Sequence, residues 1–167
     1  MRKILFIMTF FLPSLALADT GYLGNYEIQA SPLVGYSNLG GFSIGAESKF
    51  RYRWDAHWQA ELGFGYLTSK YQSSRDYSAG VVYNFSDDFS RSWFLGAGAG
   101  WIDGQSIYST STTIDRNSHL YWYLTAGRRF QLSDDGHWTW NPYAQLVAEQ
   151  NEPAQIRIMP LSFGYSF

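Results

Sequence analysis

Large apolar side chains occupy every second position of the last segment of the chain, from Met159 to Phe167. A period of two is the period of a β-strand with one apolar face. Ser162, Gly164 and Ser166 share the opposite face, which is small or polar. This alternation is typical of a strand in a membrane-spanning barrel, although a strand of a soluble sandwich can show it too.

The same alternation recurs along the chain and predicts strands over residues 26–36, 42–54, 58–66, 77–85, 93–101, 120–130, 138–149 and 159–167. Several connections are short and carry Asp, Ser and Gly, which are the residues of tight turns. The longest connection, Asp103 to His119, is rich in Ser and Thr, and we expect it to be a loop. The pattern therefore predicts an all-β fold, an eight-stranded antiparallel up-and-down transmembrane β-barrel.

The N-terminal segment has the three-part pattern of a secretory signal peptide. Residues 2 and 3 are basic, an apolar run follows from Ile4 to Phe11, and Ala16-Leu17-Ala18 offers a cleavage site with small residues. We therefore expect residues 1–18 to be a cleaved signal peptide and residues 19–167 to form one barrel domain. The apolar run is too short for a retained membrane helix, which needs about 20 residues.

Composition narrows the class of protein further. Aromatic residues make up 19% of the chain and Gly contributes 16 residues, but no apolar run after the leader is long enough for a membrane helix. Only helices and closed barrels satisfy their backbone polar groups in lipid, so an exported chain of this kind favours a barrel. The absence of Cys excludes disulfides and Cys-based metal sites.

The charge balance argues against nucleic acid as a partner. The chain has 12 basic and 14 acidic side chains, and removal of the leader takes away two basic ones, which leaves ten against 14 and a net charge of −4. A mildly acidic exported chain lacks the basic surface that nucleic acid requires. The sequence also suggests no cofactor and no metal site.

Charged residues gather on the face that we expect to point into the barrel, namely Glu27, Glu47, Lys49, Arg51, Arg53, Glu61 and Arg129. They form either a path for protons or ions, or a polar plug in which opposite charges neutralise each other. We favour the plug, because the interior of an eight-stranded barrel is just wide enough to be filled by side chains. Gly96, Gly98 and Gly100 share an inward face, so we expect the backbone there to admit bulky neighbours.

Tryptophan residues are expected at the two membrane interfaces. An even number of strands places both chain ends on one side, and the short turns around Asp55, Asp87 and Asp134 identify that side as periplasmic. The predicted girdles are then Trp54, Trp58, Trp93, Trp138 and Trp140 at the periplasmic rim, and Trp101 and Trp122 at the outer rim. Arg128 interrupts the apolar face of its strand, either at a bulge or at the interface, where its side chain can reach head groups.

The strand number, the signal peptide and the alternating C-terminus resemble the family of small eight-stranded outer-membrane barrels that includes the OmpA transmembrane domain and OmpX. The resemblance implies residence in the bacterial outer membrane, contact with lipid and lipopolysaccharide, and a monomer. It also implies that Met159, Leu161, Phe163, Tyr165 and Phe167 form the signal that the outer-membrane assembly machinery recognises. Members of this family act as surface scaffolds, adhesins or complement-evasion factors, so the resemblance implies no single role.

Two more specific functions remain open at this stage. In the first, the connection from Asp103 to His119 binds a surface ligand, since it carries apolar residues among hydroxyl groups. In the second, the protein is a lipid A-modifying enzyme, an acyl hydrolase or transferase. The deacylase-like arrangement needs a His-x-Ser pair on the penultimate strand, but residues 144–151 contain neither His nor Ser. An acyltransferase of the palmitoyl type needs an apolar interior, and the predicted interior is charged.

The three histidines offer no convincing catalytic group. His57 and His137 precede Trp in two similar turn sequences, Asp-Ala-His-Trp and Asp-Gly-His-Trp. His119 follows Ser118, and neighbouring residues of a strand point to opposite faces, so these two are poor partners for catalysis. We therefore predict no catalytic residues and a structural or surface-interaction role, with the enzyme as the alternative.

Overall fold

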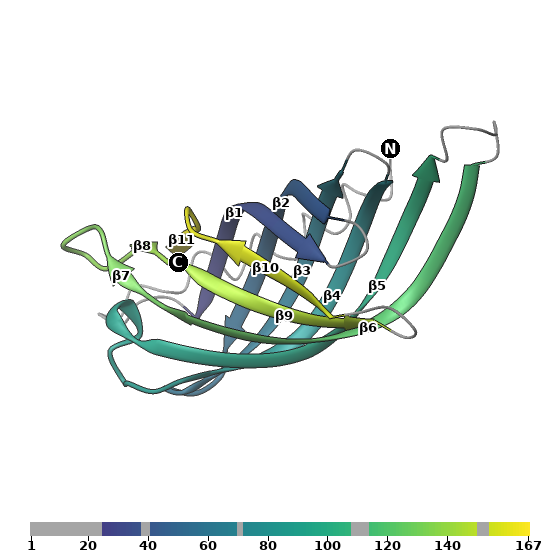
Figure 1. Ribbon diagram of the computed structural model, residues 1–167. Coiled ribbons are helices and arrows are strands. Elements are labelled where there is room, and N and C mark those ends of the chain that lie inside the picture. The colour runs from purple at the N-terminus through teal and green to yellow at the C-terminus, as the bar shows by residue number, and fades with distance from the viewer. Residues whose placement is uncertain (1–24, 38–40, 70–71, 108–113, 150–153) are drawn as a thin grey trace, which may run out of the picture.

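The computed structural model describes residues 25–37, 41–69, 72–107, 114–149 and 154–167. The predicted signal peptide lies outside the described residues. A single antiparallel sheet curves round until its first and last strands meet (Figure 1). Within the described residues, no helix is both long and apolar enough to cross a membrane.

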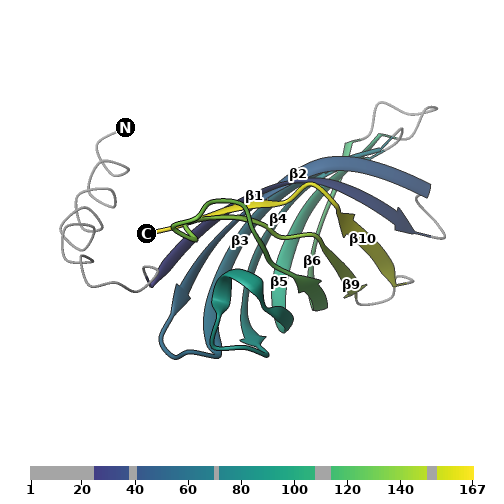
Figure 2. The ribbon, with the colours of Figure 1, turned by 90° about the vertical axis from the view of Figure 1, so that its left-hand side faces the viewer.

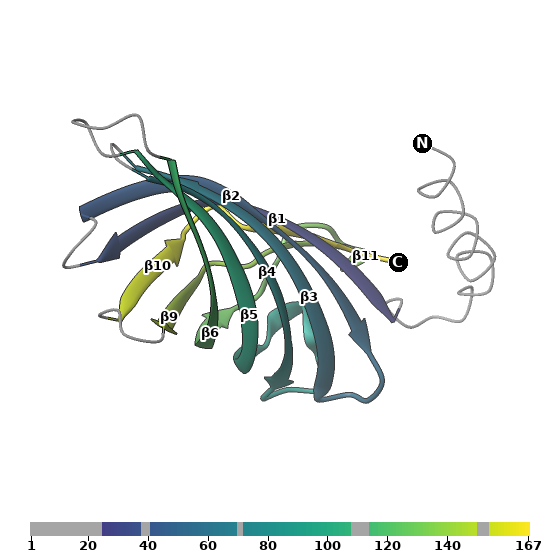
Figure 3. The same cartoon turned by 90° about the vertical axis from the view of Figure 1, so that its right-hand side faces the viewer.

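The described strands have the following bounds: β1 Tyr26–Ser37, β2 Gly41–Arg53, β3 Trp58–Thr68, β4 Gln72–Asn84, β5 Trp93–Ile107, β6 Ile114–Arg128, β7 Phe130–Gln131, β8 Trp138–Trp140, β9 Tyr143–Glu149, β10 Gln155–Met159 and β11 Phe163–Ser166. A short 3-10 helix, η2, covers Phe89–Arg91. Neighbours along the chain lie side by side in the wall, as Figure 3 shows for β2 to β6.

The eleven strands form eight continuous segments of the barrel wall, which we call staves. Three of the staves are each interrupted once and therefore consist of two strands. β6 and β7 form the sixth stave, β8 and β9 the seventh, and β10 and β11 the eighth. β1 pairs with β2 on one edge and with β10 and β11 on the other, which closes the barrel. The predicted fold class is therefore confirmed.

The barrel has an inverted distribution of polarity. Outward side chains are apolar and exposed, such as Ile44 at 63% and Leu124 at 60%, whereas inward ones are mainly polar and buried, such as Glu61 at 1%. A water-soluble protein buries its apolar side chains and exposes its charges. The reverse arrangement in a closed barrel is that of a bilayer-spanning strand wall, with an apolar band outside and a polar interior.

The two ends of the barrel differ. We call the end that holds Asn25 and Phe167 the turn end; its connections lie around residues 54–57, 85–92 and 132–137. The opposite end is the loop end. Figure 2 shows η2 as a short teal coil near the mouth of the turn end.

The connection from Asp103 to His119, predicted to be a loop, is mostly strand. β5 runs to Ile107 and β6 begins at Ile114, and the two pair throughout. β6 pairs with β9 only from Tyr121 onwards, so the hairpin projects beyond the wall at the loop end (Figure 1). The polar composition does not distinguish a loop from such a hairpin, because strands outside the bilayer need no apolar face. In the same way, residues 72–76, which lie outside the predicted strand over residues 77–85, belong to β4.

The last stave contains a β-bulge. Ala30 pairs with Phe163 and Val34 with Ile158, so three residues of β1 lie opposite four of the last stave. One extra residue in a strand shifts its register and bends it. Pro32, which has no N–H group to donate to the ladder, lies in the interrupted stretch.

The bulge corrects the prediction for the terminal pattern. Met159 does not share the outward face with Leu161, because the extra residue reverses the alternation between them. Met159 is fully buried inside the barrel, and Leu161 is 55% exposed outside. The last stave also begins at Gln155 rather than at Met159.

Candidate functional site

A row of opposite charges crosses three neighbouring strands of the interior. Glu27 of β1, Arg51 of β2 and Glu61 of β3 are direct partners in the strand register, and all are buried. The Arg51 Nε donates to Glu61 at 2.8 Å, and its Nη1 donates to Glu27 at 3.5 Å. One guanidinium group therefore joins two carboxylates that would otherwise repel each other.

The row continues across glycines to Tyr123 of β6. Glu61 is followed in register by Gly80 of β4, Gly98 of β5 and then Tyr123. A Cβ atom on Gly98 would lie 2.5 Å from the Tyr123 ring, and one on Gly80 would lie 2.2 Å from its hydroxyl group. The Tyr123 side chain thus covers both glycines and donates to Glu61 at 2.9 Å. The prediction that the backbone admits a bulky neighbour is therefore confirmed at Gly98.

Lys49 links this row to a further carboxylate. Its Nζ donates to Glu61 at 2.9 Å and lies 3.8 Å from Glu47. The Tyr143 hydroxyl donates to Glu47 from the opposite wall. The Lys49 ammonium group also lies over the Tyr143 ring, 4.9 Å from its centroid, where the ring electrons attract a cation.

Arg129 enters the interior from the junction between β6 and β7. Its guanidinium group donates to Gln59 at 2.8 Å and to Glu27 at 3.3 Å, and it also bonds Asn84. The same group lies 3.9 Å from the centroid of Phe89, a buried residue of η2. Arg129 therefore ties the turn-end helix to the charged row.

A second ion pair, missed by the sequence analysis, lies closer to the loop end. Arg157 of β10 pairs with Asp76 of β4, and both are buried. The Arg157 Nε also donates to Gln155 at 2.8 Å. Both residues fell outside the predicted strands, which began at residues 77 and 159. The alternation of β4 and β10 would have placed them inside if the strand starts had been recognised.

The buried charges of the described interior balance. The four carboxylates are Glu27, Glu47, Glu61 and Asp76, and the four basic groups are Lys49, Arg51, Arg129 and Arg157. Each is within ion-pair or hydrogen-bond distance of an opposite charge or a tyrosine hydroxyl group. Such an arrangement holds the strands together electrostatically and fills the space between them. Among the described residues, no group of three or more His, Asp or Glu side chains is arranged to hold a metal ion.

The structure places the predicted site residues as follows. Six of the seven predicted interior charges are buried, and Arg53 is half-buried at the turn end, with its guanidinium group 5.1 Å from the Phe89 centroid. Six of the seven tryptophans are exposed on the outside, and Trp140 is half-buried. Leu161, Phe163 and Tyr165 face outwards, and Phe167 is half-buried at the closing edge of the barrel.

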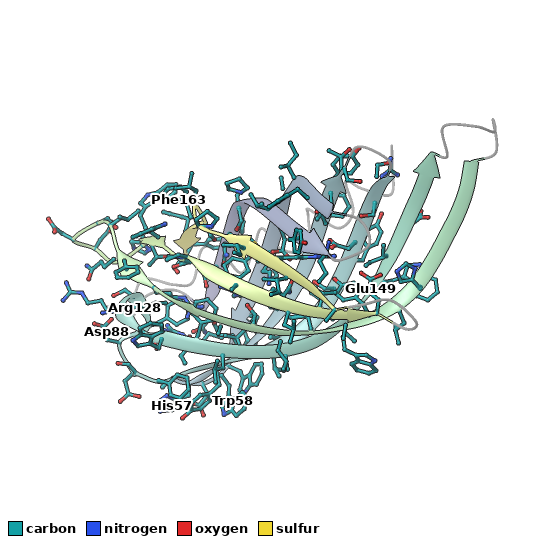
Figure 4. All side chains as sticks on the ribbon, viewed as in Figure 1. His57, Trp58, Asp88, Arg128, Glu149 and Phe163 are labelled. Carbon is teal, nitrogen blue, oxygen red and sulfur yellow. The ribbon has the colours of Figure 1, made fainter. Side chains whose placement is uncertain are left out.

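Ser118 and His119 point to opposite faces, as adjacent strand residues should. His119 Nε2 lies 2.5 Å from the carboxylate of Glu149 at the loop end, and Ser118 donates to Asp103 at 3.4 Å. Among the described residues, the Ser118 hydroxyl group is therefore not brought to this histidine. Figure 4 shows Glu149 at the opposite end of the barrel from Arg128 and Asp88.

The two similar turns make the same contacts. The His57 N–H and the His137 N–H each bond the Asp two residues earlier, at 3.3 and 3.0 Å. The two histidine rings stack on Tyr83 and Tyr165, with centroids 5.4 and 5.7 Å apart. Each Nδ1 also bonds the carbonyl group of the residue after that Tyr. The repeat recurs four staves later in the barrel, so these two turns are built alike.

This fold is that of the small eight-stranded outer-membrane barrels. Among solved structures, the N-terminal β-barrel domain of Pseudomonas aeruginosa OprF matches with a TM-score of 0.68 and 12% identity, over 87% of this chain and 100% of that chain. Neisserial surface protein A matches with a TM-score of 0.64 and 11% identity, over 87% of this chain and 99% of that chain.

A third similar structure carries a ligand. Ail, the attachment invasion locus protein of Yersinia pestis, was solved in complex with the heparin analogue sucrose octasulfate; it matches with a TM-score of 0.58 and 17% identity, over 85% of this chain and 96% of that chain. No family model matches the sequence. The comparison with curated proteins gave no match either.

Proposed function

We propose that the protein is an integral outer-membrane barrel with a sealed interior, and that its function resides on the surface exposed at the loop end. The apolar outer face and the similar outer-membrane barrels support this location. In this proposal residues 1–18 direct export and are removed, the turn end faces the periplasm and the loop end faces outwards.

The observation that carries the sealed interior is the balance of buried charge. Four carboxylates and four basic groups bond each other across the space that a pore would need. Opening a path would separate several of these pairs, and an unpaired buried charge is strongly unfavourable.

Planar lipid bilayers test this part of the proposal. We expect the refolded mature chain to give no large steady conductance, with insertion confirmed by the heat-modifiable migration of the folded barrel in gels. A reproducible open channel of porin size would contradict the sealed interior.

The projecting β5–β6 hairpin supports a surface-interaction role. From Ile114 to Leu120, β6 pairs with β5 on one edge, and no described residue pairs with its other edge. A free strand edge presents unpaired N–H and C=O groups that a partner can bind. Replacing residues 106–115 with a short turn should leave the barrel intact and remove ligand binding.

Heparin is the probe that we would use first, because a structurally similar protein binds a heparin analogue. We expect cells that carry the full chain to bind heparin-coated surfaces and cells that carry the trimmed chain to lose this binding. Equal binding by both would exclude the hairpin as the heparin-binding site. The absence of binding by the full chain would exclude a heparin-like ligand.

The lipid A-modifying alternative gains no support. Ser118 and His119 lie on opposite faces, and the described interior is charged rather than shaped for an acyl chain. The lipid A profile of cells with and without the protein is the direct test. An acyl-chain difference that His119→Ala abolishes would overturn the non-enzymatic proposal.

A further inference from the structure

Arg128 lies on the outward face of the wall. The exposed side chains of β6 alternate from Leu120 through Trp122, Leu124 and Ala126 to Arg128. The strand register continues unchanged into β7, so Arg128 marks no bulge. Of the two explanations offered by the sequence, the position at an interface is the one that fits.

Arg128 lies at the same level along the barrel axis as the exposed aromatic residues at the turn end. Its direct partner in β5 is Trp93, which is 59% exposed on the outer face. Phe130 follows two residues later and stacks on Trp140 at 5.0 Å. Belts of exposed aromatic residues lie at the level of the lipid head groups.

Two aromatic rings hold the Arg128 guanidinium group. It lies 5.2 Å from the Trp93 centroid and 4.8 Å from the Phe130 centroid. Contacts with ring faces leave the N–H groups at the edge of a guanidinium available as donors. The three buried arginines all pair with carboxylates, whereas no acidic side chain of the described residues forms an ion pair with Arg128.

We propose that Arg128, held by Trp93 and Phe130, binds the phosphate of an anionic phospholipid head group in the periplasmic leaflet. The planar fork of a guanidinium matches the oxygen atoms of a phosphate. The nearby turns carry Asp87, Asp88, Asp134 and Asp135, which disfavour free anions arriving from the periplasm. A lipid phosphate reaches Arg128 from the membrane side. The inference rests on the proposed membrane location.

The test compares binding of phosphatidylglycerol and phosphatidylcholine by native mass spectrometry of the refolded mature chain. We expect wild-type protein to retain phosphatidylglycerol more strongly and Arg128→Gln to weaken that retention about five-fold, the effect of one basic residue at an anionic surface. Arg91→Gln removes the same charge from an exposed turn-end residue that bonds Gln131, and should keep the preference.

Several outcomes would overturn the inference. An unchanged lipid preference in Arg128→Gln, or an equal loss in Arg91→Gln, would show that general charge accounts for binding. Protection from thermal unfolding by inorganic phosphate, lost in Arg128→Gln, would assign the site to a free anion. Failure of the wild-type chain to insert into vesicles would instead contradict the proposed membrane location itself.

Discussion

The Tyr123 hydroxyl group and the Glu61 carboxylate are 2.9 Å apart, although their strands, β6 and β3, have two other strands between them. Side chains at Gly98 and Gly80 would block this approach. The two glycines are therefore part of the interior network, because they leave room for Tyr123 to donate a hydrogen bond to a carboxylate on a distant strand.

We predict that Tyr123→Phe lowers the free energy of unfolding by about 1.5–3 kcal/mol, the range for a hydrogen bond to a charged group. Glu61 would keep Lys49 and Arg51, so the fold should persist. Urea unfolding in lipid vesicles, followed by tryptophan fluorescence, gives the measurement. Tyr66→Phe, which removes a hydroxyl group from an exposed outward ring, is the matched control and should change little.

Gly100 and Tyr121 allow a cleaner test of the glycine positions. A Cβ atom on Gly100 would lie 2.4 Å from the Tyr121 ring, and its three nearest neighbours all belong to that side chain. Gly100→Ala should therefore destabilise the barrel by about 1–3 kcal/mol through overpacking. In a Tyr121→Ala background the same change should be nearly neutral, and additive effects of the two substitutions would contradict this explanation.

The sequence predicted the strands of the barrel wall better than it predicted the ends of those strands and the bulge. A period of two identified all eight staves, because lipid outside and a polar space inside impose opposite demands on alternate residues. The requirement for alternate apolar and polar residues ends where the hairpin leaves the membrane. Asp103–Ile107 and Ile114–His119 therefore carry no alternation that marks a strand. The bulge in the last stave was equally hidden, because the apolar Met159 suits either face.

The interior site was predictable only where strand boundaries were recognised. Glu27, Arg51 and Glu61 alternate within well-marked strands, whereas Asp76 and Arg157 precede the apolar residues that first indicated their strands. The repeated Asp-x-His-Trp sequences were visible as a pattern. The rings on which the two histidines stack come from distant strands and could not be inferred from the turns alone.

Breaking the missed ion pair should be costly. We predict that Arg157→Ala destabilises the barrel by about 3–5 kcal/mol, because Asp76 would remain buried without its partner. Replacing Arg157 with Leu and Asp76 with Asn together should recover much of this loss. If the double variant unfolds as easily as Arg157→Ala in urea, the unpaired carboxylate is not the cause.

We predict that the turn at Asp135 makes the stability of the barrel depend on pH. Hydrogen bonds from the Ser133 hydroxyl and from the His137 N–H lower the pKa of Asp135. A lowered folded pKa adds stability above the unfolded value near 3.8, and this stability is lost as the pH falls through the folded pKa. Asp135→Asn should thus lower the unfolding midpoint at neutral pH and not in strong acid. Asp134→Asn is the neighbouring control, and an equal effect would indicate loss of general charge.

The bulge separates the buried Met159 from the outward-facing residues of the terminal pattern. Met159 is fully buried, so Met159→Ala should destabilise the folded barrel by about 2–5 kcal/mol through a cavity, while assembly into the outer membrane stays near normal.

Phe167→Ala keeps the backbone bonds with Tyr26 that close the barrel and removes the side chain that we propose the assembly machinery recognises. We expect it to lower outer-membrane levels more than it lowers the stability of barrel refolded in vitro. Quantifying both variants in isolated outer membranes and in urea titrations separates the two effects; normal membrane levels of Phe167→Ala would contradict a recognition role for this residue.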